Sequence, residues 1–185
     1  MNFGRWLVYD PKNPRLKGDG SFYVNSKLRS GQFRDGLSKT LAIAEVKAFT
    51  SYIRNTSDPG AEIPESHEDL PKSGEFKLGS VLNSNTGHTE WCDGRVHHSG
   101  FTTVFTPNTF VPFNRDGTKY DIDVNTMKEG GSDSQATYAA ITARSHHNGG
   151  VNTANMDGSV RFVTNDVQRS AWRAMSTRDG KDRTE

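Results

Sequence analysis

Hydrophobic and polar residues alternate along short stretches of the chain, and clusters of Gly, Pro, Asn and Asp separate these stretches. A period of two is typical of β-strands, and the separating clusters are typical of turns. The pattern predicts five strands: Leu41–Val46, Phe101–Thr106, Thr137–Ala143, Val151–Met156 and Ser159–Val163. The first has an alternative, a short helix over residues 41–49, because four residues also have helical spacing: Leu41, Ala44, Glu45 and Ala48. We favour the strand.

The clearest local prediction is a β-hairpin near the carboxyl end. Val151–Met156 and Ser159–Val163 flank the dipeptide Asp157-Gly158, which is typical of two-residue turns. Both central residues of a type I′ turn have positive φ, which Asp tolerates and Gly adopts freely. We therefore expect a type I′ turn at Asp157 and Gly158.

A short helix is expected after the hairpin, with Asn165 or Asp166 as its cap. Four apolar residues fall on one side of this helix: Val167, Ala171, Trp172 and Met175. We expect the Trp172 side to pack on the sheet and the helix to end before Gly180.

Composition narrows the class of protein. The 185 residues include 10 Phe, 5 Tyr and 3 Trp, too many large aromatics for an unfolded chain, and the length fits a single domain over residues 1–185. Residues 58–75, with three prolines and six acids, are expected to form a long solvated loop inserted in that domain. The net charge of +1 gives no basic field for nucleic acid. No apolar run approaches membrane-spanning length, and no secretory signal opens the chain, so no membrane association is expected.

Histidine and carboxylate residues are densest between His88 and His98. On one strand, His88 and Glu90 would point to the same face, and His98 could return beside them after the turn at Asp93-Gly94. Two imidazoles and a carboxylate are ligands for a divalent metal, so His88, Glu90 and His98 are the candidate metal ligands. The segment has no HExxH helix and no thiolate pair, and we therefore expect no tightly bound transition metal and no other cofactor.

A second pair, His147 and Asp157, would be a natural acid–base dyad. An extended strand between them would place the two residues near its opposite ends, so we instead expect Asp157 to serve the turn and His147 to anchor the bend at Gly149-Gly150. Nucleophile motifs are also weak. Three serines, Ser21, Ser38 and Ser145, lie near glycines or basic residues but in no G-x-S-x-G sequence. The acidic and apolar neighbours of Cys92 give no reason for a reactive thiolate. No catalytic residue is predicted.

Three blocks of sequence resemble a known family. The first is Arg144–Asn152 followed by Met156–Phe162, in which nine residues separate His147 from Asp157-Gly158. This resembles the carboxyl-terminal signature of pseudopilin-like proteins of unknown function, which carry the His-x-nine-Asp-Gly prepilin-processing-associated domain and are related to the G-type pseudopilins of type II secretion. The other two blocks, Phe33–Val46 and Glu90–Asn108, resemble the family's D-G-x-S-x-T-L…E and W-x-D-G…H-x-G-F-T…P-N segments. The motif residues are His147, Gly149, Gly150, Asp157, Gly158, Asp35, Gly36, Glu45, Trp91, Asp93, Gly94, His98, Pro107 and Asn108.

The resemblance implies an α+β fold: a pilin-like globular head with an antiparallel β-sheet, long loops and a short C-terminal helix. It further implies a non-enzymatic structural or surface protein of an export or pilus-type system, exported to the periplasm or cell surface. Its partners would be other pseudopilin-like subunits or cell-surface components. The family's basic leader and long hydrophobic amino-terminal helix have no counterpart in this chain, so we expect a monomer or weak dimer that does not polymerise. The strand before Asp157-Gly158, usually apolar in the family, carries Thr153 and Asn155, which indicates a face that is solvated or paired with polar groups.

Two alternatives remain open at this stage. One is an extracellular binding module for glycan or peptide, which would use exposed aromatics such as Trp91 and Phe101. The other is a metal-dependent hydrolase built on His88, Glu90 and His98. Exposed coplanar aromatic rings would favour the first, and convergent His and Glu side chains with a vacant ligand position would favour the second.

Overall fold

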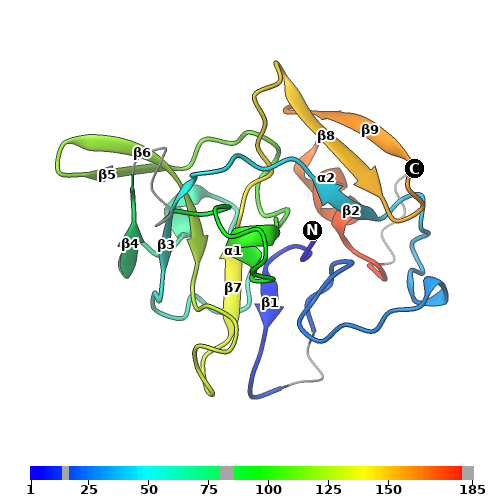
Figure 1. Cartoon of the computed structure of the whole chain (residues 1–185), viewed down its shortest axis with the longest axis horizontal. Coiled ribbons are helices and arrows are strands. Elements are labelled where there is room, and N and C mark those ends of the chain that lie inside the picture. The colour runs from blue at the N-terminus through cyan, green and yellow to red at the C-terminus, as the bar shows by residue number, and fades with distance from the viewer. Residues whose placement is uncertain (14–16, 80–85, 181–185) are drawn as a thin grey trace.

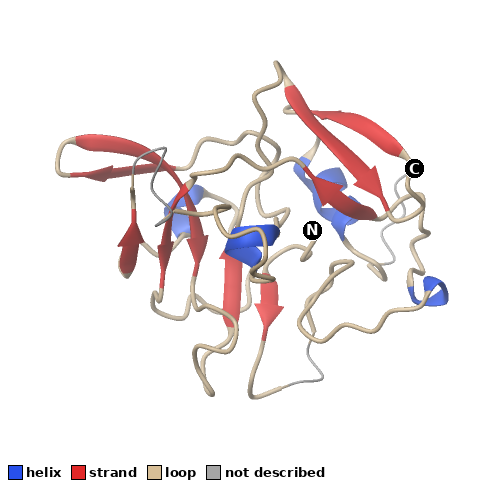
Figure 2. Ribbon diagram, viewed as in Figure 1, coloured by secondary structure: helices blue, strands red, loops and turns tan. Residues whose placement is uncertain are grey.

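The computed structural model describes residues 1–13, 17–79 and 86–180, which form two β-sheets and little helix (Figures 1 and 2). The larger sheet contains β1 (Leu7–Tyr9), β3 (Ser51–Arg54), β4 (Glu75–Lys77), β5 (Pro112–Arg115), β6 (Thr118–Asn125) and β7 (Thr137–Ala140). The smaller contains β2 (Leu41–Ala44), β8 (Gly150–Asn155) and β9 (Val160–Thr164). The helices are α1 (Val96–Ser99) and α2 (Arg169–Ser176), with 3₁₀ turns η1 (Ser30–Gln32) and η2 (His67–Asp69).

The larger sheet has the order β1-β7-β6-β3-β4, with β5 paired to β6 as a hairpin. The pairing of β3 with β6 is parallel, and the other pairings are antiparallel. Its main core is formed by large apolar side chains that include Trp6, Ile53 and Val124. Trp6 stacks on Tyr138 of β7 with ring centroids 5.4 Å apart, which adds an aromatic contact to the burial of both rings.

The smaller sheet has the order β2-β8-β9 and is antiparallel throughout. Figure 1 shows α2 against one face of this sheet, and that face carries the second core, which includes Leu41, Val151 and Trp172. The indole of Trp172 is fully buried beside Phe101. The prediction that the Trp172 side of the helix packs on the sheet is therefore confirmed. The predicted cap is wrong, because α2 begins after Gln168 and neither Asn165 nor Asp166 caps it.

Arg144 connects the two sheets. Its guanidinium is buried and donates to both carboxylates of the neighbouring strand β6: Nη2 lies 3.0 Å from Asp121 Oδ1, and Nη1 lies 2.5 Å from Asp123 Oδ1. Its backbone N–H donates to the carbonyl of Glu45, which follows β2, at 2.9 Å. One residue thus binds β6 through its side chain and the smaller sheet through its backbone.

The predicted α+β fold with a pilin-like head is wrong. The regular secondary structure of the described residues is mostly β-strand in two sheets, α2 is their one helix of more than seven residues, and β3 and β6 pair in parallel. The physical reason is the lack of helical periodicity outside residues 169–176, together with turn residues at short intervals. None of the described helices is long and apolar enough to cross a membrane.

Most of the predicted strands form. The strand interpretation of residues 41–46 is confirmed by β2, and the helix alternative is wrong. The strands at residues 137–143, 151–156 and 159–163 correspond to β7, β8 and β9. Residues 101–106 form only isolated bridges, Asn2 with Phe101 and Thr102 with Thr142, because no continuous partner strand lies beside them.

The Asp157-Gly158 hairpin is confirmed, but its turn type is not. Gly158 has φ of +85°, whereas Asp157 is not among the described non-glycine residues with positive φ. Asn155 N donates to Ser159 O, and Gly158 N donates to Asn155 O, so the loop has three residues and ends in a left-handed glycine. The type I′ turn occurs instead at the other hairpin, between β5 and β6, where Asp116 and Gly117 have φ of +49° and +78°.

The acidic segment 58–75 is tied to the rest of the molecule at several points. Leu70 is buried in the main core, and the carboxylate of Glu65 accepts from Arg173 of α2 at 2.5 Å and from Arg169 at 3.0 Å. The expected solvated loop is therefore anchored by the apolar side chains of Leu70 and Ile63 and by the ion pairs of Glu65.

Replacing Gly158 by Val is expected to cost about 1–2 kcal/mol, because a branched side chain is strained at positive φ. A Cβ at Gly158 would meet no atom within 4 Å, so strain is the cause of the loss. Gly31→Val is the control, since Gly31 has equally open space without positive φ. Thermal and denaturant unfolding measure both, and equal stability of the two variants would contradict the expectation.

Replacing Arg144 by Met is expected to lower the free energy of unfolding by about 3–5 kcal/mol, because it leaves the buried Asp123 carboxylate without its cation. Arg34→Met removes a mostly exposed ion pair with Asp179 and should cost about 0–1 kcal/mol. Urea unfolding of the two variants checks this difference. An Arg144→Met protein as stable as Arg34→Met would show that the buried pair contributes little.

Candidate functional site

Histidines gather around the short helix α1. His97 is buried in it, stacks on Tyr52 at 5.1 Å between ring centroids, and has Nδ1 at 2.8 Å from Asn125 Nδ2. Burial lowers the pKa of His97 to about 3 and that of His88 to about 4. Both imidazoles are therefore neutral at physiological pH.

Glu90, Asp93 and His98 converge beside this helix. One ligand atom from each lies within 4.8 Å of the others, and His98 Nε2 is 3.8 Å from Glu90 Oε1. The His98 side chain is 6% exposed and that of Glu90 is 55% exposed, so the group lies at the surface with its imidazole inside. Two carboxylates and a neutral imidazole form a donor set that suits a divalent transition metal.

The predicted third ligand, His88, is not part of this group. Residues 88–95 contain turns rather than a strand, and His88 itself has φ of +56°. Its Nδ1 lies 3.1 Å from the carbonyl of His98, and its Nε2 is buried with no hydrogen-bond partner. The shared strand face expected for His88 and Glu90 is therefore wrong, and Asp93 occupies the place that sequence reasoning gave to His88.

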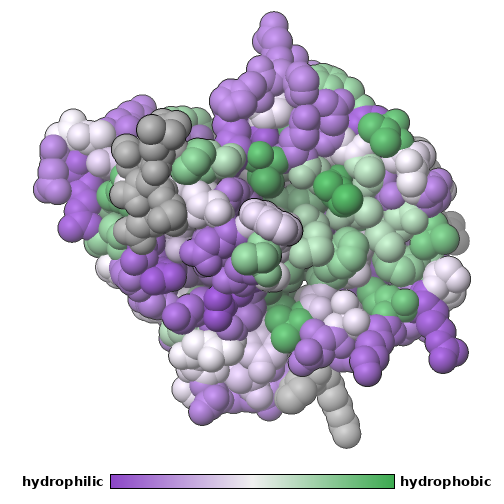
Figure 3. Space-filling model, viewed as in Figure 1, coloured by the Kyte–Doolittle hydropathy of each residue, from purple (hydrophilic) through white to green (hydrophobic). Residues whose placement is uncertain are grey.

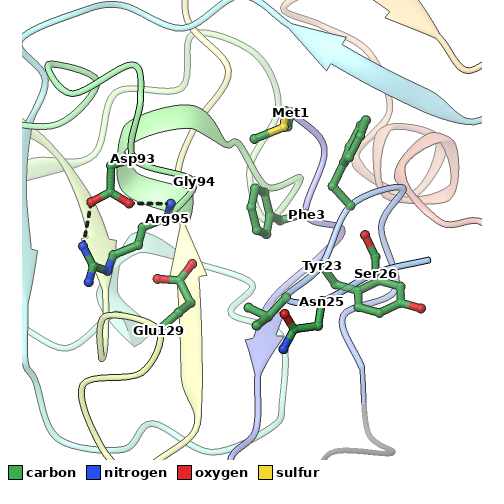
Figure 4. A pocket seen from close by; sticks show the side chains of 11 residues that line it. Met1, Phe3, Tyr23, Asn25, Ser26, Asp93, Gly94, Arg95 and Glu129 are labelled. Atoms are coloured by element: carbon green, nitrogen blue, oxygen red, sulfur yellow. Dashed lines mark hydrogen bonds and ion pairs between the residues drawn. The ribbon is translucent and has the colours of Figure 1, made fainter. Parts of the chain in front are cut away.

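Asp93 and Arg95 also line a cavity of about 460 Å³ (Figure 4). Its apolar wall comes from Met1, Phe3, Phe22, Tyr23 and Val24, and its polar wall from Asp93, Arg95 and Glu129. Glu129 Oε1 accepts from the Val96 N–H at 2.9 Å, while Oε2 is buried without a partner, and burial raises the pKa of this carboxyl. Sequence reasoning missed Glu129, whose only local signal is the turn that follows at Gly130-Gly131.

The residues of the His-x-nine-Asp-Gly signature do not form a dyad. His147 Nε2 lies 3.1 Å from Glu45 Oε1, which follows β2. The same carboxylate accepts from Asn152 of β8 through its backbone N–H at 2.7 Å and its side-chain amide at 3.2 Å. Asp157 accepts from the backbone and hydroxyl of Ser159 within the turn. The expected turn role of Asp157 is confirmed, and His147 belongs to an anchor between β2 and β8.

The other signature residues support the same hairpin. Gly150 must lack a side chain, since a Cβ there would lie 2.3 Å from Val163 O, and Gly149 has φ of +84°. Asn108, just after the buried Pro107, donates to Gly150 O at 3.2 Å and accepts from Ser145 N at 2.8 Å.

The block Phe33–Val46 is hydrogen-bonded to the residues that follow α2. Asp35 accepts from Thr177 Oγ1 at 3.2 Å and from Gly180 N at 2.7 Å, and Gly36 has φ of +99°. Gly94 lines the cavity beside Asp93. These residues position backbone rather than a reacting group.

The candidate nucleophiles are either engaged or isolated. Ser145 Oγ donates to Gly150 O at 2.6 Å, and Ser21 Oγ donates to Leu41 O at 2.5 Å. Ser38 offers its carbonyl to Asn155, and the thiol of Cys92 is free and exposed. Trp91 is 91% exposed, but Phe101 is fully buried, so the two rings expected to form a binding platform do not lie on one surface.

The solvent-facing side of the smaller sheet is apolar. Ile43 of β2, Ala154 of β8 and Val160 of β9 lie in one row across it, and Phe162 lies in the next row opposite Asn152. Ile43 is 53% exposed, Val160 72% and Phe162 47%. In Figure 3, hydrophobic residues gather on the right-hand part of the visible face, over β2 and β8. Thr153 and Asn155, predicted to be solvated or paired with polar groups, are buried and hydrogen-bonded.

Replacing Glu45 by Gln is expected to destabilise the fold by about 1 kcal/mol, a modest figure because the carboxylate is partly exposed. Partial burial acts against ionisation, but hydrogen bonds from Asn152 and the nearby His147 lower the pKa of Glu45 below its usual 4.5. A lowered folded-state pKa contributes stability that is complete above the unfolded pKa and is lost as the pH falls through the folded value. The difference between wild type and Glu45→Gln should therefore be full at pH 7 and shrink below about pH 4.5. Unfolding curves from pH 7 to pH 3 measure it, with Glu68→Gln as an exposed control, and a pH-independent difference would refute the role.

Comparison with known proteins agrees with the sequence blocks at the level of family. No curated protein and no solved structure matches the chain. One family model matches residues 3–170, which is most of the chain and includes all the signature residues described above. The chain therefore belongs to the SBP_bac_10 family, described as "Protein of unknown function (DUF1559)".

Proposed function

We propose that the protein is a non-enzymatic structural or surface protein of the export or pilus type, and that it associates weakly with a second copy through the outer edge of β9. The observation that carries this proposal is the apolar edge of the smaller sheet, to which no other described strand pairs. The placement in an exported, pseudopilin-like system rests on the resemblance of the three sequence blocks alone.

The backbone of β9 alternates between two directions. Ser159 O accepts from Asn155 N of β8, and Asn165 N donates to the carbonyl of Gly149, just before β8. Hydrogen-bonded positions alternate along an antiparallel pair, so the backbone groups of Arg161 and Val163 also face β8. The backbone N–H and C=O groups of Val160 and Phe162 therefore point away from β8, outward from the edge of the sheet. Such an edge is a template for pairing with another strand.

A second copy fits this edge. If two β9 strands pair antiparallel about a two-fold axis at Phe162, Arg161 lies opposite Val163 and not opposite another Arg161, so no like charges face each other. Val160 and Phe162 of both copies then share one face. The net charge of +1 opposes this pairing little. A single strand edge buries less surface than a stable dimer needs, which supports weak association.

The signature of the family supports this proposal because its residues build the hairpin itself. His147 and Glu45 anchor β8 to β2, Gly150 admits the close approach of β9, and Gly158 closes the loop. The glycan or peptide alternative is less well supported, since Trp91 is exposed and Phe101 is buried.

Replacing Phe162 by Lys is expected to weaken self-association about tenfold or more, because a charge on the edge strand opposes pairing. Sedimentation velocity over a range of protein concentrations measures the dissociation constant. Phe110→Lys is the matched control, since Phe110 is similarly exposed at 48% but lies outside β9. A wild-type protein that stays monomeric at millimolar concentration, or equal weakening by both variants, would refute the β9 interface.

A further inference from the structure

We infer that Glu90, Asp93 and His98 form a binding site for one divalent transition-metal ion of the Zn²⁺ class. This site is independent of the β9 interface. It replaces the expectation that the chain holds no such metal, which rested on the missing ligand spacing in the sequence. The structure shows a different set of ligands from the one expected, with Asp93 in place of His88 as the third ligand.

The geometry brings three donor atoms around one point. They lie within 4.8 Å of one another, and the 3.8 Å between His98 Nε2 and Glu90 Oε1 is too long for a hydrogen bond. Metal–ligand bonds of about 2.0–2.2 Å place neighbouring ligand atoms roughly 3–4 Å apart, which matches this separation. The His98 and Glu90 side chains therefore face each other across a space of the size an ion takes.

The imidazole of His98 lies against the ring of His97, with centroids 4.3 Å apart, and its Nε2 points to Glu90 without a hydrogen bond. Its side chain is 6% exposed, and its Nδ1 is buried with no hydrogen-bond partner. The nitrogen that faces Glu90 is Nε2, and an ion between them would give this nitrogen a partner that Glu90 is too distant to provide directly.

Asp93 is held in position by its neighbour. Arg95 donates to Asp93 Oδ1 through its backbone N–H at 2.9 Å and to Oδ2 through Nη1 at 2.6 Å. Hydrogen bonds of this kind orient ligand carboxylates in metal sites, and each carboxylate oxygen retains a further lone pair. The positive guanidinium of Arg95 offsets part of the negative charge of the two carboxylates, so we expect moderate rather than very tight affinity for a cation.

The donor set selects the class of ion. One imidazole and two carboxylates favour Zn²⁺, Mn²⁺, Co²⁺ or Ni²⁺ over Ca²⁺ and Mg²⁺, which prefer oxygen ligands alone. Three protein ligands leave a position open to water, and Glu90 lies on the solvent side. Other described histidines offer less: His67 pairs only with Glu68, and His147 only with Glu45.

The test is isothermal titration of the untagged, chelator-treated protein with ZnCl₂. We expect one ion per chain, with affinity about tenfold or more weaker in Glu90→Gln and His98→Gln. Glu90→Gln is the decisive variant because its exposed side chain can be changed without disturbing the core; circular dichroism confirms the fold of each variant. Glu68→Gln is the matched control, since it disrupts an exposed His–Glu pair that lacks a third ligand.

A second readout uses Trp91, which lies between Glu90 and Asp93. Of the three tryptophans, Trp6 and Trp172 are buried and Trp91 is exposed. Co²⁺ or Ni²⁺ at the site should quench the fluorescence of Trp91, and Trp91→Phe should abolish that quenching while Zn²⁺ binding remains. The inference is overturned if the wild type binds no ion, if Glu90→Gln binds as tightly as Glu68→Gln, or if CaCl₂ binds as tightly as ZnCl₂.

Discussion

The arrangement of the two sheets depends on a single buried cation. Arg144 lies just after β7, and its guanidinium neutralises two carboxylates on β6, while its backbone reaches the chain beyond β2. Asp123 could not remain ionised in this position alone, because the cost of burying a charge falls only when a partner is present. Arg144 neutralises Asp123 of β6 and also hydrogen-bonds to Glu45 beside β2. The residue that allows β6 to be buried in the larger sheet therefore also holds the smaller sheet next to it. The anchor at His147 and Glu45 begins three residues further along the chain and extends this connection into β8.

The sequence predicted those elements that are formed by residues close together in the chain. The β8–β9 hairpin and α2 were predictable because turn chemistry and periodicity both lie within a few residues. The same dipeptide nevertheless adopts two turns: Asp116-Gly117 joins strands in direct register, whereas Asp157-Gly158 follows Met156 in a three-residue loop. The dipeptide alone does not determine how many residues the loop contains.

Long-range pairing explains what sequence reasoning missed. β6 contains Lys119, Asp121 and Asp123, and such a charged segment does not resemble a buried strand until Arg144 is placed beside it. Likewise, His88 and Glu90 have the spacing of one strand face, but the turns at residues 88–95 direct them apart and bring Asp93 to His98. The ligand types were predictable, whereas their grouping depends on backbone conformation that no periodicity encodes.

The strand pairing has a consequence for the order in which the chain can fold during synthesis. Leu7 pairs with Tyr138, Ser51 with Ile122 and Ile43 with Ala154, so β1 and β2 wait for a partner from the second half of the chain, and β3 has only β4 beside it until β6 is made. At about 5–20 residues per second, a ribosome needs on the order of ten seconds to add the residues between such partners. During this time Trp6, Leu41 and Ile53 have no core to enter. A factor that holds unfolded chains could bind these apolar segments throughout that interval, and release would have to follow the synthesis of β8.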